Sequence, residues 1–100
     1  MELPIVCTLS PDALRARREG LLSDLVRRAE HVDVLPGGLR IRFGAAADTL
    51  QKLAMAVQAE RHCCRFLRFT IAVEPDGGPI VLELTGPSGT PEFLAALLDI

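Results

Sequence analysis

The fold is decided by residues 32–43, which read VDVLPGGLRIRF. In the second half of this stretch Leu39, Ile41 and Phe43 fall on one face, and the arginines between them fall on the other. Such alternation is typical of a strand with one buried face. The Pro-Gly-Gly run at 36–38 is a turn signal. These residues therefore predict two strands joined by a turn, within an antiparallel sheet that is covered on one face.

The same kind of pattern continues on both sides of this stretch. We expect further strands at Leu3–Leu9, Phe69–Val73 and Ile80–Leu84, and helices from Pro11 to about Glu30, from Asp48 through Cys63 and Cys64, and from Thr90 onward. Asp48, followed three residues later by Gln51, resembles a capping box. The order β-α-β-β-α-β-β-α predicts an α+β fold with a ferredoxin-like core. We expect about five strands, helices on one face of the sheet, and a single domain over residues 1–100.

Composition limits the classes of function. The chain has 100 residues, of which 49% are apolar and 24% charged, with a formal net charge of −2. This profile is that of an ordinary globular protein, and the charge argues against non-specific nucleic-acid binding. There is no apolar run of membrane-spanning length and no secretory signal at the first residues. We therefore expect a cytoplasmic protein without membrane contact, whose cysteines stay reduced.

The chemistry of the chain is concentrated in its cysteines. Cys63 and Cys64 are adjacent, and Cys7 is the third. On a helix, Cys64 shares the stripe of Leu50, Leu53 and Val57, whereas Cys63 lies about 100° away. Glu60 falls at the edge of the stripe, between the two cysteines in projection, so Glu60, Cys63 and Cys64 form one cluster through i,i+3 and i,i+4 contacts.

Topology brings Cys7 into this cluster. In a split βαβ sheet the first strand and the second helix run in the same sense, so that both end at the same edge. Cys7 is near the end of the first predicted strand, and Cys63 and Cys64 end the second predicted helix. We therefore expect three sulfurs in one site.

Three thiolates are ligands for thiophilic ions such as Hg(II), Cu(I), Zn(II), As(III) or Pb(II). We predict a metal or metalloid site made of Cys7, Cys63, Cys64 and Glu60, used in detoxification, buffering or sensing. Glu60 would ligate the ion or neutralise it, and Arg61 would hold Glu60 or the thiolates. His62 is a weaker choice for the fourth ligand, because it points largely away.

Three alternatives stay open. One is a thiol-based redox enzyme or transferase with one vicinal cysteine as nucleophile, although a nucleophilic cysteine usually has a helix N-terminus and an oriented base nearby. Another is that Cys7 and Cys64 only fill the core. A third is an interaction module, for example a homodimer formed through a sheet edge or an exposed sheet face.

Three segments resemble a group of small bacterial proteins. They are CTLS at 7–10, ERHCCRFLRF at 60–69 and LTGPSG at 84–89. Members of that group carry C-T-L, E-R-x-C-C-P-F-L-x-F and L-x-G-P-x-G at these places. The chain departs from the pattern at Arg65, where the group has proline. The resemblance implies no particular activity, but it carries Cys7, Glu60, Cys63 and Cys64 as shared positions.

Overall fold

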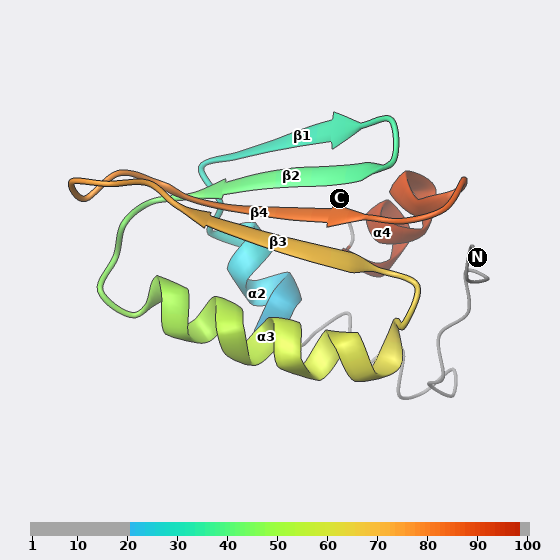
Figure 1. The fold of residues 1–100 in the computed structure, drawn as a ribbon, viewed down its shortest axis with the longest axis horizontal. Coiled ribbons are helices and arrows are strands. Elements are labelled where there is room, and N and C mark those ends of the chain that lie inside the picture. Colours follow the sequence, from blue (N-terminus) through green and yellow to red (C-terminus); the bar gives the residue numbers. More distant parts are fainter. Residues whose placement is uncertain (1–20, 99–100) are drawn as a thin grey trace.

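The structure is a computed structural model that describes residues 21–98. Its elements are α2 (Leu21–Arg27), β1 (His31–Leu35), β2 (Gly38–Phe43), α3 (Thr49–Cys63), β3 (Arg68–Val73), β4 (Ile80–Thr85) and α4 (Thr90–Leu98). The four strands form an antiparallel sheet in the order β1-β2-β4-β3 (Figure 1). The predicted α+β class and antiparallel sheet are confirmed. The predicted strand Leu3–Leu9, with Cys7, and residues 11–20 of the first predicted helix lie outside the described residues.

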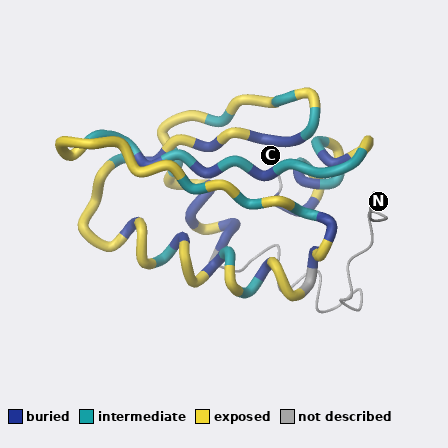
Figure 2. The backbone as a smooth tube through the Cα atoms, viewed as in Figure 1, coloured by how far each residue is buried: buried dark blue, intermediate teal, exposed yellow. Residues whose placement is uncertain are grey.

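The two central strands carry the alternation predicted from the sequence. Ile41 of β2 is paired with Leu82 of β4, and both side chains are fully buried. On the opposite face of the same two strands, Arg40 donates a 2.8 Å hydrogen bond to Glu83. Figure 2 shows this alternation along the sheet as changes between buried and more exposed positions. One face of the sheet therefore belongs to the core and the other to solvent.

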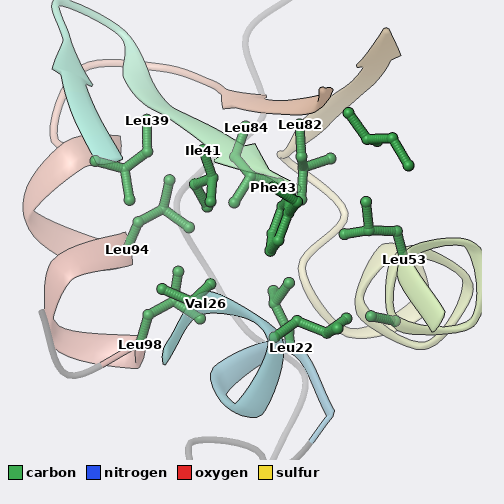
Figure 3. Packing of buried hydrophobic residues seen from close by; sticks show 13 residues of the cluster. Leu22, Val26, Leu39, Ile41, Phe43, Leu53, Leu82, Leu84, Leu94 and Leu98 are labelled. Atoms are coloured by element: carbon green, nitrogen blue, oxygen red, sulfur yellow. The ribbon is translucent and has the colours of Figure 1, made fainter. Parts of the chain in front are cut away.

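Three helices cover the buried face of the sheet. Figure 3 shows side chains from α2, α3 and α4 converging beneath β2 and β4. The labelled members of this core are Leu22, Val26, Leu39, Ile41, Phe43, Leu53, Leu82, Leu84, Leu94 and Leu98. The prediction that helices lie on one face of the sheet is thus confirmed for the described helices. Within residues 21–98, no helix combines the length and apolar character needed to cross a membrane.

A tight turn joins β3 to β4. Asp76 and Gly77 both have positive φ, 61° and 72°, and Gly78 N–H donates to the carbonyl of Pro75 at 3.1 Å. Two successive residues with positive φ are what a type I′ hairpin turn requires, and Asp-Gly is among its preferred sequences. This turn makes β4 the direct neighbour of β3.

The strand order differs from the predicted one. β2 and β3 are both antiparallel to β4, so they run parallel to each other, with α3 connecting them and β4 lying between them. This is a split βαβ unit. In the predicted ferredoxin-like order, the strand at residues 3–9 would lie beside β2, whereas β4 occupies that place.

Candidate functional site

The buried face of α3 leads directly to Glu60. Leu53 and Ala56 are buried on this face, Glu60 follows one turn after Ala56, and Cys64 ends the helix at the C-cap. At 100° per residue these four side chains leave the helix within about 80° of one another. Leu50 is 43% exposed, so its predicted place in the buried stripe is wrong. The stripe is rotated toward Glu60, which lies in its middle rather than at its edge.

Glu60 and Cys64 form a contact inside the protein. The thiol of Cys64 donates to Oε2 of Glu60 across 3.9 Å, and the two residues are 0% and 2% exposed. The same two residues are also joined through the backbone, where the N–H of Cys64 donates to the carbonyl of Glu60 at 2.7 Å. Both residues also take part in further interactions. The predicted i,i+4 contact and the burial of Cys64 are therefore confirmed.

A small apolar cluster surrounds Cys64. Its buried members besides Cys64 are Phe66 and Leu97, and Phe93 packs against them. The rings of Phe66 and Phe93 meet edge to face, with centroids 5.1 Å apart and an interplanar angle of 76°. Sequence reasoning missed this contribution of α4, because contacts between residues about thirty positions apart leave no periodic signal. The cluster keeps water from Cys64, which strengthens electrostatic interactions there.

The end of β4 lies at the same end of the molecule as Cys64. α3 leads from the end of β2 back to the start of β3, so it runs in the same sense as β4 (Figure 1). The loop after β4 touches the turn after α3, since a Cβ added to Gly86 would lie 3.3 Å from Phe66. The predicted topology placed the strand with Cys7 in this position. In the structure β4 occupies it, so the topological argument for Cys7 no longer applies.

Only part of the predicted metal site falls within the described residues. Cys7 lies outside them, and of Cys63 the structure describes only the backbone, as the last residue of α3. In the described part of the chain, no group of three or more His, Cys, Asp or Glu side chains could hold a metal ion. His62 is exposed, and its Nε2 lies 3.5 Å from Nε2 of Gln58. This agrees with the prediction that His62 points away from the site.

The described residues test the expected role of Arg61 only for a contact with Glu60. Arg61 is exposed, and none of the ion pairs found within residues 21–98 joins it to Glu60. Its guanidinium group lies on the outside of the last turn of α3, whereas the carboxylate of Glu60 lies inside. Arg61 therefore makes no ion pair with Glu60 within the described residues, and its expected action on the thiolates remains a prediction.

The separation of the Cys64 sulfur and the Glu60 oxygen is compatible with a shared metal ion. Zinc binds cysteine sulfur at about 2.3 Å and carboxylate oxygen at about 2.1 Å. The sum of these two lengths exceeds the 3.9 Å between the two atoms, so their separation allows one ion to contact both. Binding of an ion would release the thiol proton of Cys64.

A separate cavity lies at the opposite end of α3. Its volume is about 300 Å³, and its lining includes Arg28, Asp48, Thr49 and Lys52. Asp48 and Lys52 form an ion pair there at 2.8 Å. None of the predicted site residues lines this cavity. The Glu60–Cys64 contact thus remains the only part of the predicted site that the described residues bring together.

Comparison with known proteins does not assign the chain to a family. No protein-family model matches the chain, and no match was found among curated proteins or solved structures.

Proposed function

We propose that the chain binds a thiophilic metal or metalloid ion through the sulfurs of Cys7, Cys63 and Cys64. Cys7 is included because the group of proteins that the chain resembles shares it together with Glu60, Cys63 and Cys64. Glu60 is the fourth ligand or neutralises the bound ion. Hg(II), Cu(I), Zn(II) and As(III) are the candidate ions. A reducing compartment such as the cytoplasm would keep the thiols available for binding. Detoxification, buffering or sensing are the uses that fit such a site.

The contact between Cys64 and Glu60 is the observation that supports this proposal. A cation that replaces the thiol proton would bind both the thiolate and the carboxylate. Cys63 follows Glu60 by three residues on the same helix, and this spacing favours a second sulfur near the ion.

The same contact disfavours the redox alternative at Cys64. A neighbouring carboxylate opposes formation of a thiolate, and so does the C-terminal end of a helix. Reactive cysteines usually lie in electropositive, partly exposed surroundings. Cys64 is fully buried in an apolar cluster. A bound cation would compensate both negative charges, so the surroundings of Cys64 suit a ligand better than a nucleophile.

Direct metal binding tests the proposal. Reduced full-length protein, purified without an affinity tag, should contain metal by elemental analysis or should take up Hg(II), Cu(I) or Zn(II). Formation of metal–thiolate bonds would appear as an ultraviolet charge-transfer band that saturates at one ion per chain. Binding no tighter than that of small free thiols would contradict the proposed function.

Replacing Glu60 tests its part in the site. We expect Glu60→Gln to weaken ion binding by about tenfold or more, because it removes an oxygen ligand or the charge beside the ion. Competition with a chelator of known affinity measures the change. Glu83→Gln is the matched control, since it removes a carboxylate from the outer face of the sheet. Equal affinities of the two variants would exclude Glu60 from the site.

A further inference from the structure

We infer that β3 is a self-complementary edge through which two copies of this chain pair antiparallel and form one continuous sheet. β3 (Arg68–Val73) is the last strand of the described sheet, and its side away from β4 has no neighbouring strand there (Figure 1). An open strand edge is a template for pairing with another strand. The dimer is independent of the proposed metal site.

The backbone hydrogen bonds determine which residues of β3 face the open side. The N–H of Glu74, directly after β3, donates to the carbonyl of Pro79 at 3.2 Å, so the backbone of Glu74 faces β4. Along an antiparallel pair, residues that bond to the neighbouring strand alternate with residues that do not. The backbone groups of Phe69, Ile71 and Val73 therefore point away from β4, toward the open side.

The charges of this segment stand at its two ends and have opposite signs. Arg68 and Glu74 are both exposed, and the ion pairs found within residues 21–98 include neither of them. Six positions separate them, so both lie on the same face of the sheet, and the five residues between them are uncharged. The other edge strand, β1, instead carries Asp33 in its middle, which opposes pairing with a copy of itself.

One register satisfies both the backbone and the charges. With Ile71 opposite Ile71 of the second copy, the open-side residues pair with one another through backbone hydrogen bonds, and Phe69 of each copy lies opposite Val73 of the other. The same register places Arg68 of each copy opposite Glu74 of the other. Any shift of register separates these opposite charges, so the charges select this one.

The pairing also covers apolar surface on the inner face of the sheet. Val73 is 55% exposed, which makes it one of the exposed large apolar side chains of the described residues. Phe69 and Ile71 are partly buried and pack against the core. In the dimer Val73 lies beside Phe69 of the second copy. Cross-strand pairs of aromatic and β-branched side chains stabilise a sheet.

The predicted strand Leu3–Leu9 is the other segment that could occupy this edge. It carries no charged residue that could pair with Arg68 or Glu74, and Pro4 within it has no N–H to donate. A second copy of β3 supplies both charges and a backbone donor at every paired position. The second copy therefore fits the edge better.

Charge exchange tests this register. In analytical ultracentrifugation, the mass of reduced full-length protein should rise with concentration toward twice that of one chain. Arg68→Glu places like charges opposite each other twice in the dimer and should raise the dissociation constant about tenfold or more. Glu74→Arg should do the same, and the double variant should regain most of the wild-type affinity. Within one chain the two positions are about 20 Å apart, so this rescue requires contact between chains.

Arg28→Glu is the matched control. It changes the net charge by the same amount as Arg68→Glu, but Arg28 follows α2 and lines the cavity at the start of α3. This variant should dimerise as the wild type does. An equally large loss of affinity in Arg28→Glu would overturn the inference, since net charge would then explain the effect. A double variant without recovery would overturn it as well.

Hydrogen exchange identifies what covers the edge. The amides of Phe69, Ile71 and Val73 should be protected at high protein concentration and should lose that protection on dilution. Protection that does not depend on concentration would place a segment of the same chain on the edge. A protein that stays monomeric at concentrations on the order of 1 mM would have no second copy there. Either result overturns the inference and leaves the proposed metal site untouched.

Discussion

At the start of α3, Lys52 determines the side-chain contact and lowers the pKa of Asp48. Asp48 is the N-cap residue, but its side chain makes no capping hydrogen bond and instead pairs with Lys52 at 2.8 Å. The capping box predicted with Gln51 is therefore wrong. The hydrogen bond from Lys52, followed by the charge of Lys52, lowers the pKa of Asp48. A carboxyl with a lowered pKa stabilises the folded state above its unfolded pKa, and this contribution is lost as the pH falls through the folded pKa.

Replacing Lys52 tests whether it causes the lowered pKa of Asp48. We expect Lys52→Met to raise the pKa of Asp48 toward its ordinary value, because both the hydrogen bond and the charge are lost. Titration of the Asp48 carboxyl carbon by NMR measures the shift. Lys52→Arg, which keeps the charge, should retain a lowered pKa. An unchanged titration curve in Lys52→Met would show that Lys52 is not the cause.

The candidate site could be predicted in part, residue by residue. Helical spacing was sufficient to place Glu60 next to Cys64, because side chains four positions apart on a helix are always neighbours. It could not show how deeply Glu60 is buried, since burial depends on what covers the helix. Cys7 lies outside the described residues, and its place in the site remains a prediction.

At the scale of the element, α3 offers two leucines with opposite surroundings. Leu53 is fully buried in the core, whereas Leu50 is 43% exposed. We expect Leu53→Ala to lower the free energy of unfolding by about 2–5 kcal/mol. Leu50→Ala should change it by about 0.5 kcal/mol or less. Denaturant unfolding measures both values, and similar losses would mean that the buried face of α3 is rotated from the one seen here.

The turn between β1 and β2 holds a second matched pair, Gly37 and Gly38. A Cβ on Gly38 would overlap the carbonyl oxygen of Leu84 in the neighbouring strand. A Cβ on Gly37 would meet only the carbonyl oxygen of Gly86, at 3.7 Å. We expect Gly38→Ala to cost about 3 kcal/mol or more, because backbone must move. Gly37→Ala should be nearly neutral in thermal unfolding, and a neutral Gly38→Ala would contradict the pairing of β2 with β4.

At the scale of the whole molecule, the order β1-β2-β4-β3 makes β2 and β4 the central strands. Their backbone groups are hydrogen-bonded on both sides, and their inner faces carry the core. We therefore expect the amides of Ile41 and Leu82 to exchange with solvent most slowly. Native-state hydrogen exchange followed by NMR measures this. β1 and β3 are the edge strands, and one side of each has no neighbouring strand in the described sheet. Comparable protection of the amides on that side in the monomer would contradict the observed strand order.

The sequence by itself determined the elements from residue 31 onward and the local Glu60–Cys64 cluster. Both depend on side chains two to four positions apart, and backbone geometry alone decides which of these share a face. Only the tertiary structure decided the order of the strands, the depth of Glu60 and the place of α4 beside Cys64. These depend on the packing of segments that are distant in the chain, where many arrangements satisfy the same local pattern and the burial of apolar surface selects one.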